Sequence, residues 1–523
     1  MLYTVVREQL ESFLARARER DRPVPRFVER ELRAFLGCGI LAHGFVRVRC
    51  TACGHDRLVA FSCKGRGFCP SCGGRRMADT AAHLVDRVIP EVPVRQWVLS
   101  LPFALRYRLA YDARLASEVL GLFVRTLFAS LRRRARMKWG IPRAQCGAVT
   151  FVQRFGDALN LNLHFHSLVL DGVYAPGPDG RMRFHPLPPP DDAEVARVAR
   201  RVARGIARRL EKEGLGPEAD PSEADPLAAD EPLLADLYAA SVQGRVATGP
   251  RAGQRLRRVG DRIDVDALPA LEGERCASVA GVSLHANVSV PARDRRRLER
   301  LCRYVARPPV ATERLSRLPD GKLLYRLKHR WRDGTSHVVF DALEILEKLA
   351  ALVPPPRFHL VRYHGIFGPC ASARDRVVPG AAESVAAHRP NAIDAAGASP
   401  GNGESAAEAG AGSALEPLGT AGLPACSALR GTAESSPEIG NDAACAAPPR
   451  PRRLSWSELM RRVFAIDVLE CPRCHGAMQI LAVIHPPDTT AAILACLNLP
   501  TRAPPTQPAS PEEEPVDSHQ AEW

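Results

Sequence analysis

Residues 160–170 read Asn-Leu-Asn-Leu-His-Phe-His-Ser-Leu-Val-Leu, and polar and apolar side chains alternate over the first seven positions. A period of two is typical of a β-strand, because successive side chains point to opposite faces of the sheet. The pattern therefore predicts a strand with one apolar and one polar face, and the polar face carries Asn160, Asn162, His164 and His166.

The two histidines of this strand are candidate metal ligands. Two imidazoles spaced two residues apart on a strand can bind one divalent cation, which leaves positions for a third side chain, water and a substrate phosphate. His164 and His166 would supply these imidazoles. Exposed strand histidines without a metal would give the same short pattern, so other parts of the chain must decide between the two interpretations.

The segments around this strand predict an α+β fold. Further apolar runs at 96–102, 146–155 and 281–290 alternate with helical segments, and turn signals stand at Gly156-Asp157 and Asp171-Gly172. We expect a central antiparallel sheet with flanking helices, preceded by a small zinc-binding module.

Composition changes along the chain predict four regions. A helical and zinc-binding domain is expected at 1–90, and a catalytic domain at 91–375 with an insertion at about 175–275. Residues 376–450 are rich in Ala, Gly, Ser, Pro and Glu, which cannot bury enough apolar surface to fold, so they predict a disordered linker. A small C-terminal module and tail would occupy 451–523.

The charge of the chain favours a polyanionic partner. The 523 residues include 72 Lys and Arg against 58 Asp and Glu, a formal net charge of +14. Basic chains bind nucleic acid by displacing its counterions, so DNA is the expected partner. No stretch has the roughly 20 apolar residues that span a bilayer, and we expect a cytoplasmic protein.

Two cysteine pairs predict a structural zinc site. Cys50 and Cys53 precede Cys69 and Cys72 at a spacing that lets four thiolates surround one zinc ion without an open position for water. Cys63 and His55 are competing ligands. Nearby Arg66, Arg75 and Arg76 form a cationic surface suited to DNA phosphates, although a zinc module for protein contacts is the alternative.

A tyrosine on a basic helix is the candidate nucleophile. In the segment 295–309, an apolar stripe of Leu298, Leu301, Cys302 and Val305 predicts a helix, and Tyr304 lies on the neighbouring face. A phenol needs cations or a metal to stabilise its phenolate, and the same face offers Arg297, Arg300 and Arg307. The alternative is an ordinary boundary aromatic beside a solvated basic face.

In this order, the histidine strand and the tyrosine helix resemble the HUH endonuclease group, which includes rolling-circle initiators, relaxases and certain transposases. The chain is most similar to the insertion sequence 91 family of transposases and its ISCR relatives. The resemblance rests on six segments in order: SCKGRGFCPSCGGRRM, LNLHFHSLVLDGVY, LCRYVARPP, LLYRLKHRWRDGTSHVVF, PPPRFHLVRYHGIFGP and RVFAIDVLECPRC.

The resemblance implies a fold and a mechanism. His164 and His166 would hold a catalytic Mg²⁺ or Mn²⁺ within an HUH-type antiparallel sheet, beside the structural Zn²⁺ of the N-terminal module. Tyr304 would attack single-stranded DNA at the ends of the mobile element and form a 5′-phosphotyrosine, in a rolling-circle-like transposition. Pro308 stands where a second tyrosine would be expected, which implies a single catalytic tyrosine.

Several assignments stay open at this point. Gln153 and Asn162 are candidates for a third catalytic metal ligand, Gln153 because a hairpin at Gly156-Asp157 would set it opposite Asn160, and His285 is a further possibility. Cys471 and Cys474 form half a zinc site, which His475, His485 or Cys496 could complete. A plasmid replication initiator or relaxase, and a non-catalytic zinc-dependent DNA-binding regulator, are the alternative functions.

Overall fold

The computed structural model describes residues 1–215, 225–260, 273–379, 457–458, 461–462, 467 and 469–510. The predicted linker at 376–450 lies outside the described residues from position 380 onward.

A seven-stranded antiparallel sheet forms the centre of the structure, as the α+β prediction required. Its strands follow the order β15-β4-β5-β3-β10-β9, and β11 also pairs with β3. The histidine strand β5 lies between β4 and β3 inside this sheet. The strand bounds are β3 (Val94–Ser100), β4 (Gly147–Phe155), β5 (Leu161–Leu170), β9 (Cys276–Val279), β10 (Val282–His285), β11 (Ser289–Val290) and β15 (Val361–Gly365).

The hairpin between β4 and β5 has a register that differs from the predicted one. Gln153 pairs with His164 rather than with Asn160, and Phe155 pairs with Leu161. The reason is a longer turn, which is closed by a hydrogen bond from Gly156 N to the Asn160 carbonyl (2.8 Å), together with an irregularity between Gln153 and Phe155. Gln153 therefore becomes a direct cross-strand neighbour of a histidine.

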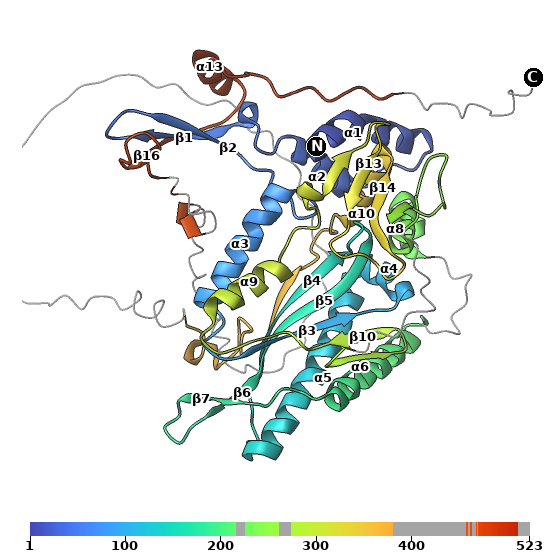
Figure 1. The fold of residues 1–523 in the computed structure, drawn as a ribbon, viewed down its shortest axis with the longest axis vertical. Helices are drawn as coiled ribbons and strands as arrows, with labels where there is room; N and C mark the ends of the chain where they lie inside the picture. The colour runs from blue at the N-terminus through green and yellow to red at the C-terminus, as the bar shows by residue number, and fades with distance from the viewer. Residues whose placement is uncertain are drawn as a thin grey trace, which may run out of the picture. The chain divides into compact units, whose positions relative to one another are not determined.

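Helices cover both faces of the sheet (Figure 1). Leu163 and Phe165 pack with α4 (Phe103–Tyr111), α5 (Ala113–Trp139) and α6 (Asp192–Lys212). On the opposite face, Leu168 packs with α3 (Pro70–Arg87) and α9 (Arg295–Val305). The histidines have the same parity as Leu168, so the period of two directs them toward α9.

Helix α9 forms as its sequence predicts. Its first turn is capped by the Asp294 carboxylate, which accepts a hydrogen bond from Arg297 N (2.9 Å), and Pro308 stands just beyond its end. The predicted apolar stripe is buried against α3 and the sheet: Leu298, Leu301, Cys302 and Val305.

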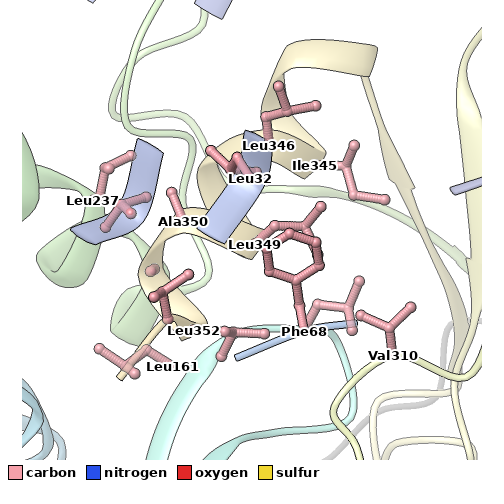
Figure 2. Close-up of a cluster of buried hydrophobic side chains, with 14 of the residues drawn as sticks. Leu32, Phe68, Leu161, Leu237, Val310, Ile345, Leu346, Leu349, Ala350 and Leu352 are labelled. Atoms are coloured by element: carbon pink, nitrogen blue, oxygen red, sulfur yellow. The ribbon is translucent and has the colours of Figure 1, made fainter. Parts of the chain in front are cut away.

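The N-terminal helices share a hydrophobic core with the rest of the chain. Figure 2 shows Leu32 of α2 and Phe68 in one buried cluster with Leu161 of β5 and Leu349 of α10. Besides single residues of α3 and α4, the helices that contribute to this core are α1 (Leu2–Glu19), α2 (Arg26–Leu36), α7 (Pro226–Asp230), α8 (Pro232–Gln243) and α10 (Ala342–Leu352). The zinc-binding region thus shares one hydrophobic core with the end of the histidine strand.

Three smaller sheets complete the described strands. The segment predicted as an insertion supplies the hairpin of β6 (Gly172–Pro176) and β7 (Met182–Pro186). Another sheet has the order β12-β13-β14-β8, with bounds Leu315–Arg317, Leu323–Arg326, Thr335–Phe340 and Arg257–Gly260. The third joins both ends of the chain in the order β16-β1-β2, with bounds Met478–Ile484, Phe45–Cys50 and Asp56–Ala60, and α13 (Asp488–Cys496) follows it.

Candidate active site and metal centres

The imidazoles of β5 lie close together on the face that α9 covers. The ring centroids of His164 and His166 are 4.8 Å apart. His164 donates a hydrogen bond from Nδ1 to the Asn162 carbonyl (2.8 Å), which leaves Nε2 as the nitrogen with a free lone pair. His166 Nδ1 lies 2.7 Å from the Gln96 side-chain amide on β3.

Burial keeps both imidazoles neutral. Desolvation lowers the pKa of His164 to about 4 and the pKa of His166 to about 2, and the positive charge of Arg307 acts in the same direction. At neutral pH both rings are therefore in the form that binds metal ions.

Within the described part of the chain, three buried polar atoms on this face have no protein hydrogen-bond partner: His166 Nε2, Gln153 Oε1 and Asn162 Oδ1. Buried polar atoms are normally satisfied, so a cluster of unsatisfied ones indicates a place for a ligand. The Gln153 side chain is fixed by its other end, because its amide donates a hydrogen bond to the Val305 carbonyl (2.7 Å) at the end of α9. All three atoms are of the kind that coordinates a divalent cation.

Tyr304 lies in the last turn of α9, next to this face. Its ring centroid is 6.1 Å from that of His166, and 39% of the residue is exposed. The guanidinium carbon of Arg307 lies 4.5 Å from the ring centroid, and Lys328 Nζ lies 4.3 Å from it. Burial alone would raise the pKa of Tyr304, but hydrogen bonding to Arg307 and the two positive charges outweigh it, so the pKa is lowered.

The structure brings together only some of the predicted basic residues. Arg307 contacts Tyr304, whereas Arg300 is exposed one turn earlier on α9. The second cation at the tyrosine is Lys328, from the turn between β13 and β14, which sequence reasoning did not connect with Tyr304. Its signal, a lysine within a run of basic and aromatic residues, is too common to single it out.

A pocket of about 100 Å³ joins the zinc-binding region to the end of α9. Arg66 and Arg76 line it from one side, and Gln153 and Arg307 line it from the other. The packing here is close, since a Cβ on Gly73 would lie only 2.6 Å from Pro308 Cβ.

The predicted arginines of the zinc-binding region differ in how far they are engaged. Arg66 donates a hydrogen bond to the Phe358 carbonyl, and Arg76 donates to the carbonyls of Gly65 (3.1 Å) and Lys64 (3.2 Å). Arg75 is exposed beside them at the start of α3.

The cysteines form two clusters, which corrects the predicted zinc site. The predicted ligands Cys50, Cys53, Cys69 and Cys72 do not come together, because each pair meets other cysteines. One cluster contains Cys38, Cys63, Cys69 and Cys72, and the other contains Cys50, Cys53, Cys471 and Cys474. The physical reason is that the first pair lies in the turn between β1 and β2, whereas the second pair lies at the start of α3, beside the end of α2.

The sulfur geometry of both clusters suits zinc. In the first cluster, Sγ–Sγ distances are 3.4 Å for Cys63 to Cys72 and 3.7 Å from Cys38 to Cys69 and to Cys72. A tetrahedral ion with Zn–S bonds of about 2.3 Å holds its sulfurs about 3.8 Å apart. These clusters therefore support structural zinc. Cys38 was not among the predicted ligands, and Cys63 was predicted only as a competing one.

No helix within the described part of the chain combines the length and the apolar character that crossing a membrane requires.

Comparison with known families agrees with this geometry. Residues 5–101 match the family model described as "Transposase zinc-binding domain" of insertion sequence 91, and this range includes all four cysteines of the first cluster. Residues 147–375 match the model described as "Putative transposase", and they include both histidines and Tyr304. No curated protein and no solved structure shows significant similarity to the chain. Together the two matches support an insertion sequence 91 family transposase, an enzyme that acts on DNA.

Proposed function

We propose that this transposase is an HUH-type tyrosine enzyme that cleaves and rejoins single-stranded DNA at the ends of its mobile element, in a rolling-circle-like transposition. One observation carries the proposal: Tyr304 lies with its ring centroid 6.1 Å from that of His166, whose Nε2 is buried without a partner. A candidate nucleophile thus stands beside a set of atoms suited to bind a metal ion.

The residues of the histidine face fit a divalent cation. His164 and His166 would bind Mg²⁺ or Mn²⁺ through Nε2, and Gln153 Oε1 or Asn162 Oδ1 would complete the protein ligands. Ligation by His166 needs the proton on Nδ1, and Gln96 can accept that proton's hydrogen bond through Oε1 once its amide is turned over. When bound, the cation would polarise the scissile phosphate and neutralise charge that develops there.

The chemistry of the chain's own residues is a phosphoryl transfer to tyrosine. The Tyr304 oxygen attacks phosphorus, the bond from phosphorus to the 3′-oxygen breaks, and the departing 3′-oxygen takes up a proton. The product is a 5′-phosphotyrosine with a free 3′-hydroxyl. Attack by a 3′-hydroxyl on the same phosphorus releases the tyrosine and reseals DNA, so no external energy source is needed.

Arg307 and Lys328 would serve both halves of this cycle. Their charges lower the pKa of Tyr304, which stabilises the phenolate as nucleophile and as leaving group. Pro308 follows Arg307 directly and offers no second phenol at the expected position, which supports the use of one tyrosine.

The test is covalent capture of DNA. Purified protein is incubated with end-labelled single-stranded DNA from the element's ends and Mg²⁺ or Mn²⁺, and a denaturing gel reports protein-linked DNA. We expect an adduct that Tyr304→Phe abolishes and chelation prevents. Tyr3→Phe, a half-buried tyrosine on α1 that packs against Phe35, is the matched control and should keep the adduct. DNA binding without any adduct would overturn the proposal in favour of a non-catalytic regulator.

A further inference from the structure

The second cysteine cluster is built from the two ends of the chain. Cys53 and Cys471 are 418 positions apart in the sequence, yet their sulfurs are 3.6 Å apart, and those of Cys50 and Cys474 are 3.4 Å apart. All four sulfurs lie within 4.8 Å of one another. This is the compact arrangement that a tetrahedral zinc ion requires.

Both halves of the cluster have the backbone of a metal-binding turn. The first pair is followed by Gly54 in the left-handed region (φ 72°). In the second, a Cβ on Gly476 would lie 3.0 Å from Ala52 Cβ and 3.3 Å from the sulfurs of Cys50 and Cys474. The backbone amides of Cys53 and Ala52 donate hydrogen bonds toward the Cys50 sulfur, as in other cysteine turns that bind metal ions.

The C-terminal segment also completes the N-terminal sheet. Strand β16 pairs antiparallel with β1, from Cys50 opposite Met478 to Phe45 opposite Ile484. Beyond the strand, Thr51 donates hydrogen bonds to the Ala477 carbonyl from both its backbone nitrogen and its hydroxyl (3.1 Å each). The two cysteine turns are therefore held in register by the ladder beside them.

Apolar burial within this sheet is small, although Leu494 of α13 is also buried beside the sheet. The hydrophobic cluster at the described part of this sheet has four buried members: Val48, Cys50, Cys471 and Met478. Along β16, Ile480 is 59% exposed and Val483 is 55% exposed. A sheet with so small a core gains little stability from its own apolar side chains, so a metal ion at the cysteine cluster would add substantially to it.

We propose that a second structural zinc ion, bound by Cys50, Cys53, Cys471 and Cys474, fastens the C-terminal segment to the N-terminal module. The proposal does not depend on the tyrosine mechanism. Removing this ion would free residues 469–484 from β1, while the first cluster would persist because Cys69 and Cys72 belong to the main hydrophobic core.

A second contact would guide the same segment toward the tyrosine helix. The Arg462 guanidinium forms ion pairs with Asp86 on α3 and with Glu299 on α9 (3.0 Å to Glu299). These pairs are partly exposed and worth little alone, so they depend on the zinc to hold the segment nearby.

Metal counting on the full-length protein is the first test. We expect two zinc ions per chain in the wild type and one in the double variant Cys471→Ser/Cys474→Ser. Cys496→Ser is the matched control, because this exposed cysteine of the same C-terminal segment lies outside both clusters, and it should keep two. Two zinc ions in the double variant, or one in the wild type, would overturn the proposal.

Cleavage between the two ends is the second test, and it does not depend on whether the double variant folds. A specific protease site is inserted within 380–450 of the wild-type chain, and the cut protein is passed over a size-exclusion column. The C-terminal fragment should coelute with the remainder and separate after a strong chelator removes zinc. A fragment that separates while both ions are present, or that stays bound after zinc is lost, contradicts the inference. Neither readout involves DNA, so neither outcome bears on Tyr304.

Discussion

The cysteine clusters and the histidine face both offer metal ligands, but they differ in how completely those ligands are used. In each cluster four sulfurs lie within 4.8 Å of one another. Four such ligands complete the coordination sphere of a tetrahedral ion and leave no position for a substrate. The histidine face instead has buried atoms without partners, His166 Nε2 among them, beside the exposed Tyr304. Closed sites suit a scaffold and open ones suit chemistry, and the proposed function accordingly gives the two regions separate tasks.

The largest expected effect comes from removing the two histidines while both cysteine clusters stay intact. We expect His164→Ala/His166→Ala to slow DNA cleavage by at least about 100-fold, because a bound cation contributes several kcal/mol to such a transition state. Zinc content should stay at the wild-type value. Single-turnover cleavage and metal analysis would measure the two quantities. His285→Ala is the control, since this exposed histidine of β10 contacts Cys276 and Ser283 instead.

The next prediction concerns which residue is the third protein ligand of the cation at the histidine face. We expect Gln153→Ala to weaken Mn²⁺ binding by about 10- to 100-fold, the range found when side chains that support a metal are removed. Gln153→Glu should bind more tightly than Gln153→Ala, because it restores an oxygen ligand. The apparent dissociation constant comes from cleavage measured against Mn²⁺ concentration. A larger effect for Asn162→Ala than for Gln153→Ala would make Asn162 the ligand.

Arg307, which lies beside Tyr304, should determine how the rate of adduct formation depends on pH. Arg307 lowers the pKa of Tyr304 and burial raises it, so in Arg307→Ala the burial effect remains and the pKa rises. Less phenolate is then present at neutral pH, and adduct formation should slow about tenfold for each unit by which the pKa rises. The rate-against-pH curve should move to higher pH.

The control for this effect is another arginine of the same helix. Arg303 is paired with Glu299 (2.6 Å), and Arg303→Ala should leave the pH profile in place. An Arg307→Ala enzyme that is slower by the same factor at every pH would assign Arg307 to phosphate binding alone.

Local patterns were predictable from the sequence because they are encoded in neighbouring residues. The alternation around His164 gave the strand and its two faces, and the spacing of Leu298, Leu301 and Val305 gave the buried side of α9. Both depend only on the period of a strand or a helix.

Pairings between distant segments were not predictable in the same way. The spacing of Cys50 and Cys53 is repeated at two other places in the chain, so spacing cannot say which pairs share an ion. The contact of Lys328 with Tyr304 depends on how a turn of another sheet packs. Gln153 lies opposite His164 because the turn is longer than predicted and β4 has one irregularity, neither of which a residue pattern indicates.

The smallest expected effect tests whether the region of the first cysteine cluster contributes to DNA binding rather than to DNA cleavage. Arg75 is exposed at the start of α3, beside the first cysteine cluster, and is proposed to contact a DNA phosphate. Arg75→Ala should weaken DNA binding a few-fold and reduce the slope of log affinity against log salt by about 1, because one phosphate contact is lost. At saturating DNA the cleavage rate should not change. Arg47 provides the matched control, since its guanidinium is already paired with Asp56 (2.6 Å) and its removal should alter the salt slope less. A fall in the saturated rate of Arg75→Ala would instead connect the first cluster with the chemical step, and the separation of tasks between the two regions would be wrong.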